Sequence, residues 1–118
     1  MMRTMLKSKL HGGTVTQAEL HYEGSITIDG DLMEQGNIIE NERVQVVNLA
    51  NGARLETYVI TGAPGSGIIC LNGPAARLCA VGDALHILSY VSASDDELVD
   101  YQPTILLLGE GNRVKSSH

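Results

Sequence analysis

The stretch Val44-Gln45-Val46-Val47-Asn48-Leu49-Ala50-Asn51-Gly52-Ala53-Arg54-Leu55-Glu56-Thr57-Tyr58 decides the fold of this 118-residue chain. Its first part, residues 44–49, is rich in β-branched residues and is typical of a strand. Asn51-Gly52 is a strong signal for a type I′ turn, in which both central residues adopt a positive φ. The stretch therefore predicts a β-hairpin whose second strand covers residues 54–60 and whose turn lies next to Arg54.

Further short strands are predicted on both sides of this hairpin, separated by turn residues. Before it we expect two strand segments within residues 3–17 with a bulge at Gly12-Gly13, a strand at 26–28, and a short helix capped by Asp29 and ended by Gly36-Asn37. After it we expect a loop at 61–67, strands at 67–71, 84–91 and 104–108, a helical turn from Pro74 to Leu78, and a flexible tail at 111–118. Many short strands with few helical turns predict a small, mainly β barrel.

Length and composition limit the classes of protein that the chain can form. A chain of 118 residues is one domain, and with 43% hydrophobic and 19% charged residues it is globular. Its aromatic residues are all tyrosines, so we expect an aliphatic core. The net charge of −6 excludes a general basic surface for nucleic acid or anionic membranes. No run approaches the roughly 18 apolar residues of a membrane span, so we expect a cytoplasmic protein.

The cysteines and histidines show no spacing typical of a metal site. Cys70 and Cys79 stand apart within apolar runs, which favours two reduced thiols that pack in the core. The histidines lie at positions 11, 21, 86 and 118, without the spacing of metal ligands. We therefore expect no metal.

The segment His21-Tyr22-Glu23-Gly24-Ser25 carries the most distinctive chemistry in the sequence. A serine hydroxyl can attack the carbonyl that precedes it and shift the acyl group from nitrogen to oxygen, when the backbone is held strained and polarised. Glycine at position 24 favours this step because it has no Cβ to obstruct the attacking oxygen. Elimination of the ester would cut the chain, and hydrolysis of the resulting dehydroalanine would leave an N-terminal pyruvoyl group at position 25. A second Gly-Ser pair, Gly65-Ser66, shows that the dipeptide alone is not specific.

Several motifs together resemble one enzyme family, the pyruvoyl-dependent aspartate 1-decarboxylases. They follow the family's order from residue 2 to about residue 110, and they are Met2-Arg3-Thr4-Met5-Leu6-Lys7-Ser8-Lys9-Leu10-His11, His21-Tyr22-Glu23-Gly24-Ser25, Ile38-Ile39-Glu40-Asn41-Glu42, Asn51-Gly52-Ala53-Arg54-Leu55-Glu56-Thr57-Tyr58, Leu71-Asn72-Gly73-Pro74-Ala75-Ala76 and Val81-Gly82-Asp83. The resemblance implies a double-psi β-barrel with short helices, assembled as a homotetramer with active sites between neighbouring subunits. It also implies self-cleavage into residues 1–24, the β chain, and residues 25–118, the α chain with the N-terminal pyruvoyl group.

The same resemblance implies the reaction. It predicts a carboxy-lyase that converts L-aspartate to β-alanine and CO₂, a step of pantothenate biosynthesis. The covalently bound pyruvoyl group would condense with the substrate amine as a Schiff base and act as an electron sink when CO₂ leaves, as a pyridoxal cofactor does.

The matched motifs imply a set of site residues. Ser25 becomes the pyruvoyl group and Tyr58 is the proton donor, while Gly24, Ser25 and Thr57 take part in cleavage, with a hydrogen bond from Thr57 to the Gly24 carbonyl. The implied substrate-binding residues are Lys9, Arg54, Thr57, Asn72, Gly73, Pro74 and Ala75. His11, Tyr22 and Glu23 flank the site.

The residue types suit these roles, although each also has an ordinary structural interpretation. The planar fork of Arg54 can donate two parallel hydrogen bonds to a carboxylate, but an arginine beside a hairpin turn is often simply solvated. Tyr58 can return a proton to a carbanion, but a strand tyrosine also fills a core. Lys9 supplies a second cation in an acidic protein, but a strand lysine is commonly exposed. Backbone N–H groups at 72–75 precede a short helix and can meet a carboxylate or an oxyanion.

Three details of the sequence do not fit a simple version of this active site. Pro74 stands where the family pattern has alanine and removes one N–H donor, and Val47 stands where some relatives have an aromatic residue, which alters the shape of the pocket. In a regular strand Thr57 and Tyr58 point to opposite faces. Both can serve one pocket only through a bulge or through a site between subunits.

Two alternatives remain at the level of sequence. The chain could be a non-catalytic small β-barrel that binds a ligand or a partner and keeps the fold without the reaction. It could also be a pyruvoyl decarboxylase with another substrate such as glutamate, because one methylene in a pocket is worth only about 1–3 kcal/mol.

Overall fold

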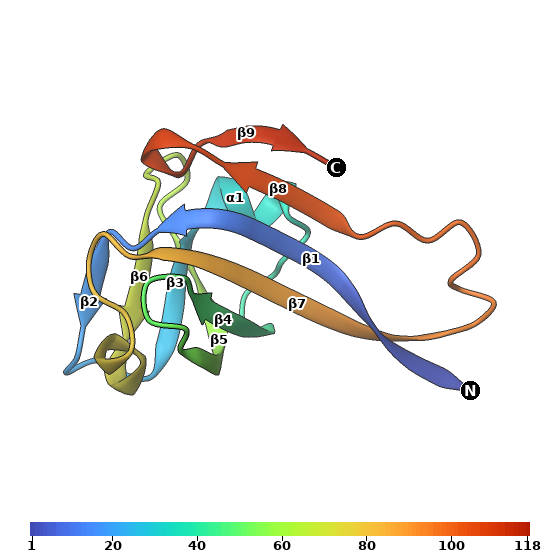
Figure 1. The fold of residues 1–118 in the computed structure, drawn as a ribbon, viewed down its shortest axis with the longest axis horizontal. Coiled ribbons are helices and arrows are strands. Elements are labelled where there is room, and N and C mark those ends of the chain that lie inside the picture. The colour runs from blue at the N-terminus through green and yellow to red at the C-terminus, as the bar shows by residue number, and fades with distance from the viewer.

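The computed structural model describes all of residues 1–118, and strands make up most of its regular structure (Figure 1). The nine strands are β1 (Met2–Thr14), β2 (Gln17–Glu19), β3 (Ser25–Asp29), β4 (Arg43–Asn48), β5 (Arg54–Gly62), β6 (Ile69–Asn72), β7 (Ala84–Ser94), β8 (Thr104–Leu108) and β9 (Val114–Ser117). One α-helix, α1 (Gly30–Gln35), and two 3₁₀ helices, η1 (Gly73–Arg77) and η2 (Glu110–Asn112), lie between them. The mainly β class with short helices is confirmed.

The strands pair in the order β2-β6-β3-β5-β4-β7-β1-β8-β9. Three of the pairs, β2–β6, β3–β5 and β1–β8, are parallel, and their members are far apart in the chain. Connections must therefore cross from one part of the sheet to another, as the expected double-psi β-barrel requires. The two ends of the sheet are tied by Asn112, whose side chain donates to Thr14 O (2.9 Å) and Gly67 O (2.7 Å) and accepts from Thr14 N (2.7 Å).

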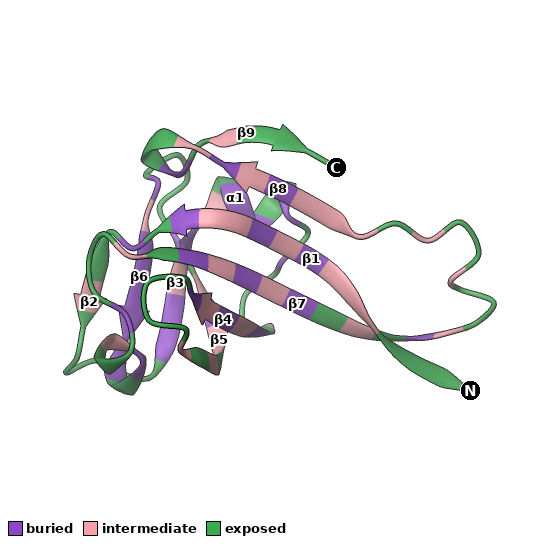
Figure 2. Cartoon of the chain, in the orientation of Figure 1, coloured by how far each residue is buried: buried purple, intermediate pink, exposed green.

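The interior of the barrel is aliphatic, as the composition predicted. A cluster of 18 buried residues fills it, and Leu10, Ile26, Val46 and Ile87 within it are fully buried. Along β1 and β7 these positions alternate with more exposed ones, whereas β3 and β6 are buried almost throughout (Figure 2). The outward side chains of the alternating strands are thus left available for other roles.

The hairpin of β4 and β5 is confirmed, but its turn is not the predicted type I′ turn. Gly52 has a φ of 73°, whereas Asn51 is not among the residues with positive φ. The loop instead spans residues 49–53: Asn48 N donates to Ala53 O (2.8 Å), and the side chains of Asn48 and Asn51 accept from Ala50 N and Ala53 N, each at 2.8 Å. Side-chain hydrogen bonds of this kind replace the backbone geometry of a two-residue turn.

The C-terminal segment is a second correction. Residues 111–118 were expected to form a flexible tail, but η2 and β9 occupy this segment, and β9 pairs antiparallel with β8. Other strands have bounds that differ from the prediction: β6 covers Ile69–Asn72 in place of 67–71, β7 begins at Ala84 as predicted but continues to Ser94, and β5 continues to Gly62. None of the helices has the length and apolar character needed to span a bilayer.

The other local predictions hold. The bulge in β1 appears as a register shift between His11 and Gly13. Both cysteines are free and buried. Asp29 caps α1, as predicted, by accepting from Asp31 N at 2.8 Å.

The Asp29 carboxylate also organises the loop that precedes β6. It accepts from Gly65 N (2.9 Å) and Gly67 N (2.8 Å) in addition to Asp31 N, and its residue is buried. Burial raises the pKa of this carboxyl, but the backbone N–H donors from Gly67, Asp31 and Gly65 outweigh burial and hold the pKa below its ordinary value of 3.8. The charged form is therefore the one that the fold favours.

We predict that Asp29→Asn lowers the free energy of unfolding by about 1–3 kcal/mol, because the new amide N–H₂ faces at least one backbone N–H donor. The measurement is equilibrium urea unfolding. Asp31→Asn, at an exposed position in the first turn of α1, is the matched control and should cost about 0.5 kcal/mol or less. Because the pKa is lowered, the stabilisation is present above pH 3.8 and is lost as the pH falls through the folded-state pKa. Equal losses in the two variants would contradict this role.

Candidate active site

Ser25 lies fully buried at the start of β3, opposite Asn72 of β6 in the antiparallel register. Asn72 Nδ2 donates to Ser25 Oγ at 2.9 Å, and Ser25 Oγ donates to Glu23 O at 3.3 Å. The hydroxyl is therefore held by one donor and one acceptor. A buried hydroxyl held in this way has a fixed orientation and is shielded from water.

Gly73 presses against the backbone that carries the Gly24-Ser25 bond. It has a φ of 65°, and a Cβ on it would lie 2.7 Å from Tyr22 O and 2.8 Å from Gly24 N. A side chain at 73 would thus displace the segment that precedes Ser25. Pro74 follows at the start of η1, with its Cδ 3.7 Å from the position of a Cβ on Gly24. The predicted residues Asn72, Gly73 and Pro74 together form the wall behind residues 22–25.

A pocket of about 410 Å³ opens beside Gly24. Five of its lining residues were predicted from the sequence, and they are Gly24, Thr57, Tyr58, Pro74 and Ala75. Three further lining residues, Leu55, Glu56 and Leu78, were not predicted. The leucines carry no chemical signal in the sequence, and only the fold brings Leu55 of β5 and Leu78, at the end of η1, to the same pocket.

Thr57 and Tyr58 both line this pocket, although they are neighbours on β5. Tyr58 immediately precedes Val59, which pairs with Ile26 in the parallel ladder, so Tyr58 is adjacent to Ser25 across the two strands. Although side chains alternate between the two faces of a regular strand, both Thr57 and Tyr58 contribute to this one pocket. No hydrogen bond joins Thr57 to the Gly24 carbonyl in this structure.

The predicted cations lie apart from Ser25. Successive strand pairs place His11 opposite His86, His86 opposite Val47, and Val47 opposite Arg54, which forms an outward row across β1, β7, β4 and β5. Three strand spacings, roughly 14 Å, separate the two ends of this row. Arg54 is also four residues from Tyr58 along β5, or about 13 Å. β5, β4 and β7 lie between β3 and β1 in the strand order, so within one chain His11 and Arg54 stand at opposite ends of a row that does not include Ser25.

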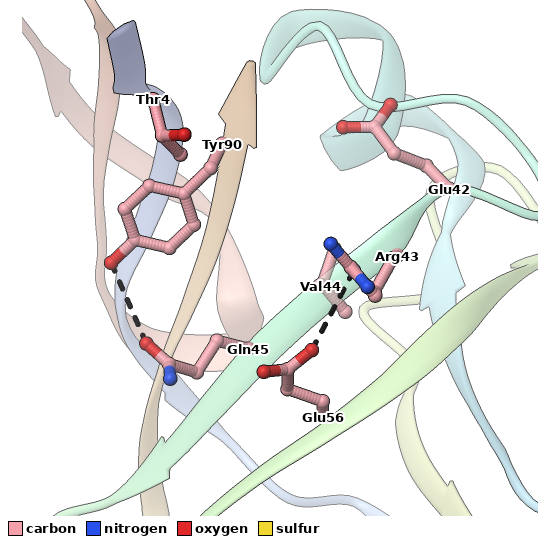
Figure 3. A pocket seen from close by; sticks show the side chains of 7 residues that line it. All are labelled: Thr4, Glu42, Arg43, Val44, Gln45, Glu56 and Tyr90. Atoms are coloured by element: carbon pink, nitrogen blue, oxygen red, sulfur yellow. Dashed lines mark hydrogen bonds and ion pairs between the residues drawn. The ribbon is translucent and has the colours of Figure 1, made fainter. Parts of the chain in front are cut away.

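Arg54 is exposed, and its Nη1 donates to Gln45 Oε1 at 2.7 Å. Gln45 in turn lines a second open pocket of about 470 Å³, in which Arg43 Nε lies 3.5 Å from Glu56 Oε2 and Tyr90 points toward Gln45 (Figure 3). This second pocket contains no residue predicted for catalysis. Its Glu56 also lines the pocket beside Gly24, so the two hollows adjoin along β5.

Two further predicted residues, Tyr22 and Glu23, lie on the segment that precedes Ser25. Tyr22 and Glu23 are exposed on the segment between β2 and β3, and the Glu23 carbonyl accepts from Ser25. No group of three or more His, Cys, Asp or Glu side chains is arranged to hold a metal ion.

His86 was not predicted as a site residue from the sequence, but it lies beside the predicted residue His11. Its ring stacks on that of His11 with centroids 4.0 Å apart, and its Nδ1 accepts from Gly12 N at 3.1 Å. Burial, followed by the charges of His11 and Lys9, holds the pKa of His86 below its ordinary value of 6.5. A proton on Nδ1 would remove the acceptor for Gly12, so the fold favours the neutral ring.

Comparisons with known proteins find relatives that match nearly the whole chain. A family model described as aspartate decarboxylase matches residues 1–115. The chain is 55% identical over 115 residues to the aspartate 1-decarboxylase of Clostridium beijerinckii, which covers 98% of this chain and 93% of that protein. It is 53% identical over 113 residues to the aspartate 1-decarboxylase of Thermoanaerobacter pseudethanolicus, with 96% and 97% covered. Among solved structures, the rationally designed mkDPBB_sym_86 protein is similar with a TM-score of 0.49 and 17% identity, over 69% of this chain and 94% of that chain.

We predict that stability falls as the pH drops from about 7.5 to 5.5, in part because of His86. The unfolded chain takes up a proton at this residue near pH 6.5, while the folded chain resists it until a lower pH. Urea unfolding of the wild type and of His86→Asn across this range measures the effect, which should be smaller in the variant. His21→Asn, at an exposed position, is the control and should keep the wild-type dependence. An unchanged slope in His86→Asn would exclude the assignment.

Proposed function

The chain belongs to the aspartate decarboxylase family, and from this premise we propose that it converts L-aspartate to β-alanine and CO₂ with a pyruvoyl group made from its own Ser25. The observation that carries the proposal is the buried Ser25 hydroxyl, which follows a glycine at the edge of a pocket that contains Tyr58. A serine needed only for a turn would have no reason to be fully buried beside such a pocket.

The first step of the proposal is self-cleavage. Ser25 Oγ attacks the Gly24 carbonyl carbon, the C–N bond breaks, and an ester joins Gly24 to the Ser25 side chain while the amino group becomes free. Elimination then releases the Gly24 carboxylate and leaves dehydroalanine at position 25. Water supplies the ketone oxygen, ammonia leaves, and the chain 25–118 begins with the pyruvoyl group.

The residues around position 25 fit such a group. Gly73 lets residues 22–24 pack closely against it, since a Cβ at residue 73 would collide with Tyr22 and Gly24, while a Cβ on Gly24 would meet only Pro74 Cδ, at 3.7 Å. When present, the ketone would supply an electron sink for decarboxylation. Tyr58 would then return a proton to the substrate carbon from the wall of the pocket.

Binding of the dianionic substrate is assigned to cations that one chain holds away from Ser25. Arg54 would grip a carboxylate through its planar fork, and Lys9 would add a second positive charge. Because Arg54 lies about 13 Å from Tyr58 along β5 and Lys9 lies on β1, which three strands separate from β3, we propose that a neighbouring subunit brings cations to the pocket. A homotetramer with its sites between subunits satisfies this need, and His11, Tyr22 and Glu23 would flank each site.

The backbone beside η1 would hold the rest of the substrate. Asn72, Gly73 and Ala75 surround the position of the new terminus, and Pro74 lacks an N–H, so the donors fall to its neighbours. Thr57 would contact Gly24 during cleavage and the substrate afterwards. The product, β-alanine, would serve pantothenate synthesis, and a cytoplasmic location stays a prediction.

We predict that Ser25→Ala stays uncut and inactive, because it lacks the attacking oxygen. Denaturing mass spectrometry of the wild type should show two fragments, residues 1–24 and 25–118, the second blocked to Edman sequencing. Borohydride with aspartate should attach the amino acid to the larger fragment. Release of residues 1–24 from Ser25→Ala would identify a contaminating protease. An intact wild type that evolves no CO₂ would favour a non-catalytic barrel.

We predict that Arg54→Ala still cleaves itself but raises the KM for aspartate by about 10- to 100-fold, the effect of losing charge-assisted hydrogen bonds to a carboxylate. Steady-state CO₂ release measures KM and kcat. Arg43→Ala is the matched control, because Arg43 is an exposed arginine on the paired strand β4 that contacts Glu56. An equal rise of KM in both variants would point to general electrostatics in place of a specific contact.

A further inference from the structure

The Asn72 side chain is the centre of a small buried hydrogen-bond network. Its Nδ2 donates to Ser25 Oγ (2.9 Å) and to Thr27 Oγ1 (3.0 Å), and its Oδ1 accepts from Cys70 Sγ (3.3 Å). Ser25, Cys70 and Asn72 are buried, and Thr27 is half-buried. Both amide hydrogens and the amide oxygen therefore have partners.

Strand pairing accounts for this arrangement. Ser25 and Thr27 lie two residues apart on β3, and their partners on β6 are Asn72 and Cys70. All four side chains therefore lie on the same face of the two strands, whereas Ile26 and Leu71 enter the core. Asn72 faces two hydroxyls on one side and a thiol on its own strand.

The orientation of the amide matters for the chemistry of Ser25. As placed, an N–H of Asn72 points at Ser25 Oγ and would stabilise the negative charge that this oxygen gains when the hydroxyl gives up its proton, before the charge passes to the Gly24 carbonyl oxygen. In the opposite orientation Oδ1 would accept the hydroxyl hydrogen and hold the proton on the nucleophile. Hydroxyls can donate or accept, so Ser25 and Thr27 fit either orientation.

The thiol distinguishes the two orientations. A protonated thiol donates to Oδ1, but sulfur is a weak acceptor for an amide N–H. Burial, with a smaller contribution from Glu19, raises the pKa of Cys70, so the thiol keeps its hydrogen. Thr27 then gives the second N–H a partner, which a buried amide needs.

We propose that Thr27 and Cys70 are positioning residues for self-cleavage, which hold the Asn72 amide so that it donates to Ser25 Oγ. This inference rests on the proposed self-cleaving function and deepens it. Neither residue touches the scissile bond. Their effect reaches Ser25 only through Asn72.

The first test compares cleavage rates by denaturing mass spectrometry after purification. Thr27→Val keeps the shape of the side chain but removes the hydroxyl, and it should slow cleavage roughly three- to tenfold, the effect of one lost hydrogen bond. Thr27→Ser keeps the hydroxyl and should cleave at nearly the wild-type rate. Cys70→Ala should also slow cleavage, whereas Cys79→Ala, the other buried cysteine, should not.

A second readout does not depend on cleavage. In the full-length Ser25→Ala chain, hydrogen exchange of the Asn72 side-chain N–H₂, followed by NMR, should be slow. Adding Thr27→Val should accelerate it about tenfold or more, and adding Thr27→Ser should not.

The outcomes separate the two proposals. Cleavage of Thr27→Val at the wild-type rate would overturn the positioning role and leave the proposed function intact. Equal slowing in Thr27→Val and Thr27→Ser would also overturn it, because a general packing defect would then be the cause. A wild type that never cleaves would overturn the proposed function and any role of these residues in cleavage. Unchanged hydrogen exchange of the Asn72 side-chain N–H₂ after Thr27→Val would overturn the inference that Thr27 orients the Asn72 amide.

Discussion

Antiparallel pairing of β3 with β6 is the interaction on which the site depends. It sets Ser25 opposite Asn72 and sends Ile26 and Leu71 into the core. A slip of one residue would set Asn72 opposite Ile26 and away from the Ser25 hydroxyl. The same packing that stabilises the barrel therefore also sets the Asn72 amide against Ser25 Oγ.

The barrel separates two kinds of environment. The 18 residues of its core cluster are hydrophobic and carry no charge. Its outward positions hold His11, His86, Val47 and Arg54 in a row across β1, β7, β4 and β5, with Lys9 also on β1. An acidic chain can in this way keep a local region that suits an anionic substrate.

Much of this organisation could be predicted from local sequence. The strands of the hairpin, the Asp29 cap and the residues around Gly24 follow from short patterns and from family motifs. The turn at Asn51 differs from the predicted type I′ turn because hydrogen bonds to the side chains of Asn48 and Asn51 stabilise a five-residue loop. A prediction from the Asn-Gly dipeptide alone does not include these side chains. β9 was missed because its polar, exposed residues gain their pairing only from β8.

Residues that act through distant partners were also beyond local patterns. His86 is an isolated histidine in an apolar strand, and only the register of β1 with β7 brings it to His11. Thr27 is likewise an ordinary strand threonine until β6, more than forty positions later, places Asn72 beside it. Pairing between distant strands creates both contacts, so no window of the sequence contains them.

The separation of the cations from Ser25 is a physical constraint on how such a barrel can work. In the strand order, β5, β4 and β7 lie between β3 and β1, and Arg54 lies about 13 Å from Tyr58 along β5. In the function proposed above, Arg54 or Lys9 would therefore reach the pocket from another copy of the chain. Under that proposal substrate binding would need assembly, whereas self-cleavage would need only the residues around Ser25 and could be complete within one subunit. The two activities proposed for this chain thus place different demands on the same fold.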